Sequence, residues 1–205
     1  MRVTTNDTKN RFGEWAQRVY VGEKYTWTVS GVLWNNIKER CQVGGATQTR
    51  EPTYVGTTNE FSGFQDFVEW HRNQVGYNMG YQLDADILCK GNKKYSPDTC
   101  VLIPAGLNKF LQTSEAKRGL WPQGIQVDKK RFCVRVGNNH LASVPLTQEG
   151  LNKGRSLFKA AKESRARDWA VILQTKDYSV DPRVISYFNN YEHNCTWRGN
   201  DFFSN

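Results

Sequence analysis

Two acidic side chains, Asp84 and Asp86, lie one residue apart in a short, largely apolar segment at 81–89. Successive side chains of a strand point to opposite faces, so both carboxylates share a face if both residues belong to one strand. Two neighbouring carboxylates can bind a divalent cation together, or one of them can accept a proton as a general base. An ordinary pair of solvated acidic residues is the alternative interpretation.

Three lysines follow this acidic pair, around a turn predicted at Gly91 and Asn92. They are Lys90, Lys93 and Lys94. A short loop that carries three cationic side chains attracts phosphate groups, because phosphates dominate the electrostatics of nucleic acids. The sequence therefore predicts contact between this loop and a nucleic-acid backbone.

A second set of charged side chains occurs in the segment 131–136, where every second residue is apolar. If the apolar side chains face a covering helix, the alternate side chains must face solvent. The alternate residues are Arg131, Cys133 and Arg135. An uncovered sheet face that bears arginines is suited to a DNA groove. An ordinary solvated sheet face with unrelated charges is the alternative.

The elements that position the acidic pair are predicted from hydrophobic spacing. Residues 1–24 are interpreted as a loosely held polar extension, in which Phe12, Trp15 and Val19 could form one face of a short amphipathic helix. Amphipathic helices are predicted at 25–40 and 61–70, strands at 81–89 and 101–103, and a helix at 107–111. The aromatic stripe of the second helix predicts core packing rather than a base-stacking surface; it comprises Phe61, Phe64, Phe67 and Val68.

The elements that position the arginines lie in the last third of the chain. Strands are predicted at 125–127, 132–136 and 141–146, followed by a helix from about residue 148 with Thr147 as its N-cap. The polar, charged stretch at 114–119 is the best candidate linker, with a boundary near 118. We therefore expect an extension at 1–24, a first domain at 25–118, a second domain at 119–190 and a tail at 191–205.

Composition favours a folded protein with an anionic partner. The chain has 28 Lys and Arg against 20 Asp and Glu, a net charge of +8 and a pI near 9.3. Such a surplus favours nucleic acid as the partner, although a generically basic protein is the alternative. There is no apolar run long enough for a membrane span and no signal-peptide core, so we expect no membrane partner and a cytoplasmic location.

Three segments of the first half resemble phage-encoded HNH endonucleases of the homing type. They are WNNIKERC, FSGFQDFVEW and LDADILCKGNKKYSPDTCVLIP, followed by Asn108. The resemblance implies a ββα fold that holds one divalent cation, Mg²⁺ or another, against a scissile phosphate. Asp84 matches the metal-binding Asp and Asn108 matches the helical Asn of that family. The general-base His position holds Ala85, and the Asn that braces the loop falls at Thr99.

The segments RFCVRV, HLASVPLTQEG and LNKGRSLFKAAKE resemble the ethylene-response-factor type of DNA-binding domain. That resemblance implies a three-stranded sheet plus one helix, with strand arginines and tryptophans in the major groove. Trp121, Arg131 and Arg135 are the matching candidates. Homing-type HNH enzymes often carry this domain behind the nuclease, so the order of the two resemblances supports both.

Together these features predict an α+β chain that binds double-stranded DNA and cuts it by metal-assisted hydrolysis. The candidate catalytic residues are Asp84, Asp86 and Asn108, with Asp84 and Asn108 as metal ligands. The candidate DNA-binding residues are Lys90, Lys93, Lys94, Trp121, Arg131 and Arg135. Because Ala85 cannot accept a proton, a DNA-binding regulator or structural factor that has lost cleavage is the rival function. RNA binding fits the charge but has no supporting motif.

Overall fold

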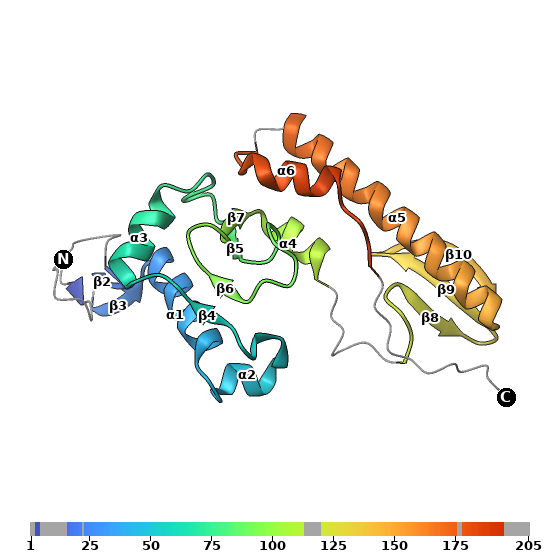
Figure 1. The fold of residues 1–205 in the computed structure, drawn as a ribbon, viewed down its shortest axis with the longest axis horizontal. Coiled ribbons are helices and arrows are strands. Elements are labelled where there is room, and N and C mark those ends of the chain that lie inside the picture. Colours follow the sequence, from blue (N-terminus) through green and yellow to red (C-terminus); the bar gives the residue numbers. More distant parts are fainter. Residues whose placement is uncertain (1–2, 5–15, 22, 113–119, 176–177, 195–205) are drawn as a thin grey trace. The chain divides into compact units, whose positions relative to one another are not determined.

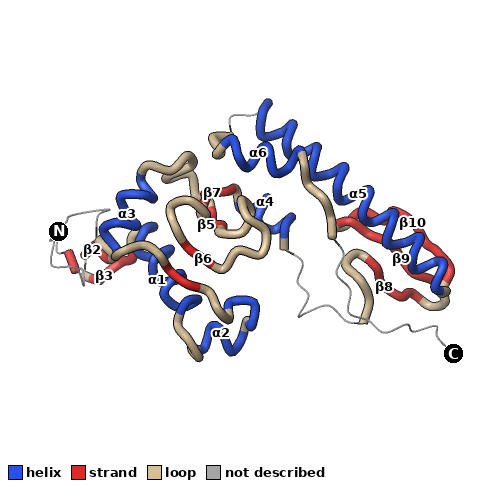
Figure 2. The backbone as a smooth tube through the Cα atoms, in the orientation of Figure 1, coloured by secondary structure: helices blue, strands red, loops and turns tan. Residues whose placement is uncertain are grey.

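The fold is α+β, as predicted, in a computed structural model that describes residues 3–4, 16–21, 23–112, 120–175 and 178–194 (Figure 1, Figure 2). The helices are α1 (Val29–Cys41), α2 (Ala46–Arg50), α3 (Phe64–Arg72), α4 (Ala105–Leu111), α5 (Gln148–Thr175) and α6 (Pro182–Asn189), with a 3₁₀ turn at Pro52–Tyr54. The strands are β1 (Val3–Thr4), β2 (Arg18–Val21), β3 (Lys24–Trp27), β4 (Thr58–Asn59), β5 (Gln82–Asp84), β6 (Lys94–Tyr95), β7 (Val101–Ile103), β8 (Ile125–Asp128), β9 (Arg131–Val136) and β10 (Asn139–Pro145).

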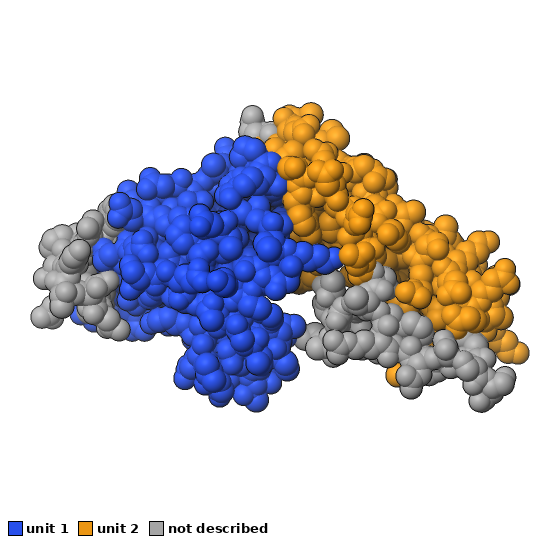
Figure 3. Space-filling model, in the orientation of Figure 1, with its two compact units in different colours: residues 1–108, 179–184 blue, residues 109–178, 185–205 orange. Residues whose placement is uncertain are grey.

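The chain divides into two compact units (Figure 3). The first comprises residues 1–108 and 179–184, and the second comprises residues 109–178 and 185–205. The division between them falls inside α4, after Asn108, and the chain returns briefly to the first unit before α6 ends. The linker expected at 114–119 lies outside the described residues.

The start of the first unit is a small antiparallel sheet in the order β1, β2, β3, where the sequence predicted an extension and the beginning of a helix. Both expectations are wrong here: residues 18–21 form a strand within the predicted extension, and residues 24–27 form a strand where the extension was predicted to end and the helix to begin. Tyr25, Thr26 and Trp27 are aromatic or β-branched and favour a strand. The helix begins only after Thr28, whose Oγ1 accepts a hydrogen bond from the Gly31 N–H at 2.9 Å. Trp15 and Phe12 lie outside the described residues.

The core of the first unit contains the aromatic stripe that the sequence predicted. Phe61, Phe64, Phe67 and Val68 are all buried, and they pack with Trp34 of α1. The rings of Phe61 and Phe67 meet edge to face with centroids 5.2 Å apart, a favourable geometry for aromatic pairs. The stripe is thus core, and α1 and α3 form the support for the strands that follow.

The site region of the first unit is a strand, a long loop, a strand and a helix. β5 pairs antiparallel with β7, with Asp84 opposite Val101, and α4 follows directly. The strand predicted at 81–89 ends at Asp84 and is therefore too long by five residues, whereas β7 matches its prediction at 101–103.

The second unit is an antiparallel sheet in the order β10, β9, β8, with α5 packed on one face. Phe132, Val134 and Val136 are buried toward the helix, as predicted, and Arg131 and Arg135 are exposed. Thr147 caps α5 by accepting a hydrogen bond from the Gly150 N–H at 3.1 Å. Gly150 also permits a close approach, because a Cβ there would lie 2.0 Å from the carbonyl oxygen of Pro145.

The described residues after 190 are not a simple tail, because Tyr191 and His193 pack within the second unit. Tyr191 lies between aromatic neighbours, with ring centroids 5.8 Å from Phe110 and 6.4 Å from Phe188. His193 is buried, and its backbone N–H donates to Glu163 at 3.0 Å. Residues 195–205 of the expected tail lie outside the described residues. In the part of the chain that the structure describes, no helix has the length and apolar character of a membrane span.

Candidate metal centre and candidate nucleic-acid interface

Asp84 closes the turn that follows β5. Its Oδ1 atom accepts hydrogen bonds from the backbone N–H groups of Asp86 at 3.1 Å and Ile87 at 2.9 Å. Aspartate commonly folds a turn in this way, because its short side chain reaches the backbone two or three residues ahead. Asp86 therefore lies in the turn and not in the strand. The expectation that the two carboxylates share a strand face is wrong, and the turn brings them together instead.

The two carboxyl groups interact. Partial shielding of the Asp86 carboxyl group from water comes first, and the negative charge and hydrogen-bonding oxygen of Asp84 come next; together they raise the pKa of Asp86 to about 6. The ammonium group of Lys93 opposes this rise. A raised pKa is what two close carboxylates produce, because like charges disfavour the ionised form. A bound cation would relieve the same repulsion.

Asn108 lies on α4, the helix that follows β7. Its Nδ2 atom donates a hydrogen bond of 2.8 Å to Oε1 of Gln82, at the start of β5. Gln82 and Asp84 are two residues apart in one strand, so the helix is attached near the acidic turn. The amide nitrogen of Asn108 is engaged in this contact, which leaves its amide oxygen as the atom suited to a cation.

The donor set at this turn fits a hard cation. Carboxylate and amide oxygens are preferred by Mg²⁺, which often takes one or two protein carboxylates and completes its shell with water and phosphate oxygens. Within the described ranges no group of three or more His, Cys, Asp or Glu side chains could hold a metal ion. A cation here would therefore depend on Asp84 and the amide oxygen of Asn108, with water and phosphate oxygens completing its shell.

Asn92 braces the loop between β5 and β7, a role that the sequence placed at Thr99. Its Nδ2 atom donates to the carbonyl oxygens of Ala85 at 2.6 Å and Lys94 at 2.7 Å. Thr99 makes a second set of contacts in the same loop: its Oγ1 donates to the Lys94 carbonyl at 2.8 Å and accepts a hydrogen bond from the Ser96 N–H at 3.2 Å. The bracing amide thus exists in this loop, seven residues before the position that the family resemblance implies.

The three loop lysines differ in their surroundings. Lys94 forms an ion pair with Glu60 at 2.8 Å, and Lys93 donates to the carbonyl oxygen of Thr53. Lys90 is exposed and has no such partner among the residues that the structure describes. Lys93 also lies near Asp86, where its charge acts on the carboxyl group. Lys90 is therefore available to a phosphate without giving up a protein partner, and the charge of Lys93 acts on the acidic turn.

The usual general-base position holds an alanine, and the three histidines of the chain lie in other surroundings. Ala85 packs against the core of the first unit, where it offers no proton acceptor. His71 is also in that core, with Nδ1 2.8 Å from Ser30 Oγ and its ring stacked on Phe67. Burial, with a smaller effect of Arg72, lowers the pKa of His71 to about 4. His140 and His193 belong to the second unit.

The exposed face of the sheet in the second unit carries a continuous polar row. Arg135 lies opposite His140, and Cys133 lies opposite both Gln126 and Ser143. His140 Nε2 is 3.1 Å from Ser143 Oγ. The face therefore presents two arginines together with groups that donate and accept hydrogen bonds, which is the chemistry needed to contact phosphates and base edges.

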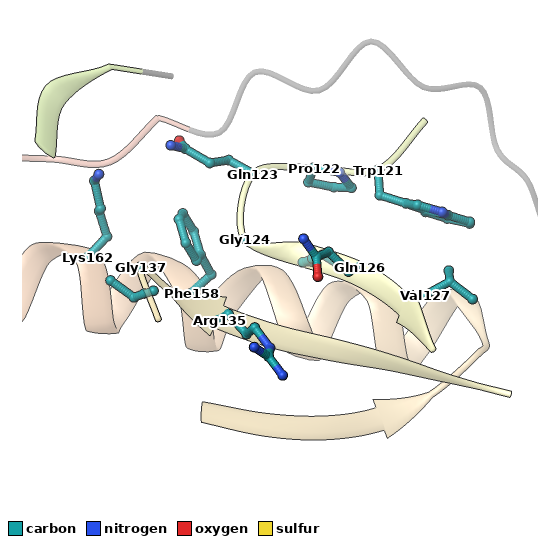
Figure 4. A pocket seen from close by; sticks show the side chains of 12 residues that line it. Trp121, Pro122, Gln123, Gly124, Gln126, Val127, Arg135, Gly137, Phe158 and Lys162 are labelled. Atoms are coloured by element: carbon teal, nitrogen blue, oxygen red, sulfur yellow. The ribbon is translucent and has the colours of Figure 1, made fainter. Parts of the chain in front are cut away.

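Trp121 is placed differently from the two arginines. Its ring packs edge to face on buried Phe132, with centroids 4.8 Å apart, so it belongs to the helix-facing core. Beside it is a cavity of about 590 Å³, shown in Figure 4, whose wall includes Arg135 and Lys162. Lys162 is buried and donates to the carbonyl oxygen of Phe110, and burial followed by the charge of Arg165 lowers its pKa to about 8.

Sequence reasoning did not identify Arg40, which belongs to the same region as Asp84. The Arg40 side chain extends from the last turn of α1, and Nη1 donates to the Tyr95 hydroxyl oxygen at 2.9 Å. The charge of Asp84 is among the influences that raise the Arg40 pKa. Arg40 and Asp84 are far apart in sequence, and the only available signal was a basic residue in the last turn of a predicted helix.

No known protein family, curated protein or solved structure shows a significant match to this chain.

Proposed function

We propose that the protein is a DNA endonuclease that hydrolyses phosphodiester bonds with the help of a divalent cation, resembling homing-type HNH enzymes of phages. The observation that carries the proposal is the Asp84–Asp86 turn, where Oδ1 of Asp84 accepts hydrogen bonds from the backbone N–H groups of Asp86 and Ile87 and so holds the two carboxyl groups close together. The strand, loop, strand and helix around this turn support it, because they attach Asn108 beside β5.

The two carboxyl groups have different proposed roles. Asp84 and the amide oxygen of Asn108 are the proposed ligands of Mg²⁺, which when bound would stabilise negative charge on a phosphate and its leaving oxygen. Asp86 is the proposed general base, in place of the absent histidine. A base with a pKa near 6 is mostly ionised at neutral pH yet still accepts a proton readily, which suits this role.

The second unit is proposed to hold the enzyme on double-stranded DNA. Arg131 and Arg135 are exposed on a face that α5 does not cover. The net charge of +8 favours a polyanionic partner and predicts binding that weakens with salt. Trp121 is not included in this contact surface, because its ring packs on Phe132.

A non-catalytic DNA-binding protein is the second candidate. One observation favours it: Ala85 occupies the position of the usual base and packs on the core. In this alternative the Asp84 turn is only a structural device that closes the loop. The two candidates share the DNA-binding face and differ in whether the turn binds a cation.

The deciding experiment is a cleavage assay on the full chain. Plasmid, phage and bacterial DNA would be incubated with the protein and its Asp84→Ala form, with Mg²⁺ or with a chelator. Discrete cuts that need Mg²⁺ and disappear in the Asp84→Ala form are expected. Tight, salt-dependent binding without any cut would support the DNA-binding candidate, and cuts that persist in the Asp84→Ala form would remove Asp84 from the mechanism.

A further inference from the structure

The Arg40 side chain is held in place from two sides. Its Nη1 atom donates to the Tyr95 hydroxyl oxygen at 2.9 Å, and its guanidinium carbon lies 4.9 Å from the centre of the Tyr54 ring. The Arg40 backbone is fixed too, because its carbonyl oxygen accepts a 3.0 Å hydrogen bond from the Gln48 side chain, which also donates to the Tyr54 carbonyl. Such a guanidinium loses little further entropy when it binds a ligand.

The electrostatic surroundings of Arg40 include the candidate metal centre. Burial by itself lowers the pKa of Arg40, but Tyr95, Tyr54 and Asp84 outweigh that effect and the pKa is raised. Asp84 also acts on the Cys100 thiol, whose pKa is raised to about 12, mainly by burial. The packing agrees with this placement: Tyr95, which holds Arg40, lies in one core cluster with Leu83 and Cys100, and these two residues precede Asp84 and its strand partner Val101 in the sequence.

Most of the hydrogen-bonding capacity of Arg40 is unused within the described residues. A guanidinium carries five N–H donors in a planar fork, and the bond to Tyr95 uses one of them. The Tyr54 ring lies against the flat face of the Arg40 guanidinium, so the N–H groups along the edge of the guanidinium stay available. A planar fork with free donors matches two oxygens of a phosphate, more closely than a lysine ammonium can.

We propose that Arg40 binds the DNA phosphodiester that is cut. This inference rests on the proposed function and adds a substrate-binding residue to it. A cation held by Asp84 would then share that phosphate with the Arg40 guanidinium. Arg40 carries a positive charge, so it opposes cation binding to Asp84 when DNA is absent and favours binding of the phosphate.

This charge relation distinguishes substrate binding from a purely structural role. If Arg40 only supports the loop, replacing it should lower the stability of the fold and, by displacing the loop, weaken cation binding. If it binds the phosphodiester, Arg40→Gln should leave Mg²⁺ affinity unchanged or raise it, because a repelling charge is gone. The same change should weaken DNA binding by about tenfold, as expected for the loss of a charge-assisted hydrogen bond pair.

The test compares four variants of the full chain: Arg40→Gln, Arg40→Lys, Tyr95→Phe and the control Arg72→Gln. Arg72 has a similar pairing with tyrosine in the same unit, through Tyr77, and the control removes the same charge. Mg²⁺ affinity would be measured by calorimetry without DNA, and affinity for a short duplex by fluorescence anisotropy in Ca²⁺, with thermal unfolding recorded for each variant.

We expect Arg40→Gln and Arg40→Lys to bind the duplex about tenfold more weakly while Mg²⁺ affinity is kept, since lysine retains the charge but not the fork. Tyr95→Phe should give a smaller loss of the same kind, and Arg72→Gln should match the native protein. Unchanged duplex affinity in both Arg40 variants would overturn the proposal. So would loss of Mg²⁺ affinity in Arg40→Lys, or rescue of duplex affinity by that variant.

The failure of this inference can be told apart from the failure of the proposed function. Asp84→Ala would be measured in the same calorimetric series. If Asp84→Ala binds Mg²⁺ as the native protein does, the metal centre itself is wrong. If it loses Mg²⁺ while Arg40→Gln binds and cuts DNA normally, the metal centre stands and only the role of Arg40 is wrong.

Discussion

At the scale of single residues, the acidic turn is organised before any ligand binds. Asp84 is buried and accepts two backbone hydrogen bonds from the turn that it closes. Its carboxylate therefore has a fixed direction, and Asp86 is held near it by the same bonds. Sites whose side chains are fixed by such supporting bonds need little rearrangement when a cation or substrate arrives.

Replacing Asp86 by Asn should separate its chemical role from the fold of the turn. The turn is closed by the Asp86 backbone N–H, which the variant keeps, so the variant should fold. If Asp86 is the general base, Mg²⁺-dependent cutting should fall by about 10²–10⁴-fold. In the native protein the cutting rate should rise as the pH passes through the pKa of Asp86 and then level off, and bound Mg²⁺ should hold that pKa below the value of about 6 for the metal-free turn. A variant that cuts at the native rate would exclude Asp86 as the base.

The same substitution should change how stability depends on pH. The pKa of Asp86 is raised in the folded protein, so the folded state holds this proton more tightly than the unfolded chain. Native stability from this group is therefore present at low pH and is lost between the ordinary aspartate pKa, about 4, and 6. The Tm of Asp86→Asn should exceed the native Tm by an amount that grows over this range and is constant above it. A constant difference at all pH values would contradict the interaction between the two carboxyl groups.

Asn92 provides a structural prediction for the loop around the turn. Its amide bonds two carbonyl groups, those of Ala85 and Lys94, and thereby joins the two sides of the loop. Asn92→Ala should lower the free energy of unfolding by about 2 kcal/mol, because the partly buried Ala85 carbonyl loses its partner and the Lys94 carbonyl keeps only its bond from Thr99. Urea denaturation measures this loss, and Thr99→Ala, which leaves the bridge from Ala85 to Lys94 intact, is the matched comparison. Equal losses in the two variants would contradict the main bracing role of Asn92.

At the scale of elements, the sheet of the second unit has one face that packs against α5 and an opposite face that is proposed to contact DNA. Alternate residues of β9 are buried under α5, and the others are exposed beside polar residues of β8 and β10. Because the period of a strand is two, no side chain of β9 serves both faces. Changes on the exposed face should therefore alter binding without altering the core.

Arg131→Ala and Arg135→Ala test the contact face. If these arginines touch base edges, each change should reduce discrimination between the preferred and a random duplex by about 1–3 kcal/mol. If they touch only phosphates, affinity should fall equally for all sequences and the salt slope should decrease by about one. Competition binding at several salt concentrations gives both quantities. Arg167→Ala, an exposed arginine of α5, is the control, and identical behaviour of all three variants would contradict a special role for this face.

Elements with a clear period were predictable, and those fixed by distant contacts were not. The alternation in β9 predicted its buried and exposed faces, and the helical spacing of Phe64, Phe67 and Val68 predicted part of the core. The hairpin of β2 and β3 was missed because its pattern was assigned to a polar extension and a helix, although Thr28 marks the true helix start. The contact between Arg40 and Tyr95 was missed because a local sequence pattern does not indicate which distant loop a helix packs against.

At the scale of the whole molecule, the division of the chain places the candidate chemistry and the candidate DNA-reading face in different units. Asp84, Asp86 and Arg40 belong to the first unit, and Arg131 and Arg135 belong to the second. The second unit has a core of its own, formed by the sheet and α5, and a further aromatic group around Tyr191. Each unit therefore has enough buried apolar surface to be tested separately.

The contacts of Phe110 predict where a self-sufficient second unit must begin. Phe110 lies next to Phe188 and Tyr191, with centroid distances of 5.9 and 5.8 Å, and Lys162 lies 3.9 Å from its ring centre while donating to its carbonyl oxygen. A fragment that starts at residue 119, the boundary expected from the linker composition, lacks all of these contacts. It also leaves the buried ammonium of Lys162 without its acceptor, which is costly for a charged group.

We therefore expect a fragment of residues 109–205 to fold and bind duplex DNA, and a fragment of residues 119–205 to be less stable by about 3 kcal/mol, near the lower end of the range for losing a large aromatic side chain. Urea denaturation followed by circular dichroism compares the two, and Phe110→Ala in the longer fragment should reproduce most of the loss. Equal stability of the two fragments would show that Phe110 is not part of this core. The fragment of residues 109–205 keeps Arg131 and Arg135. If it folds but does not bind duplex DNA, the sheet face has no part in the proposed function.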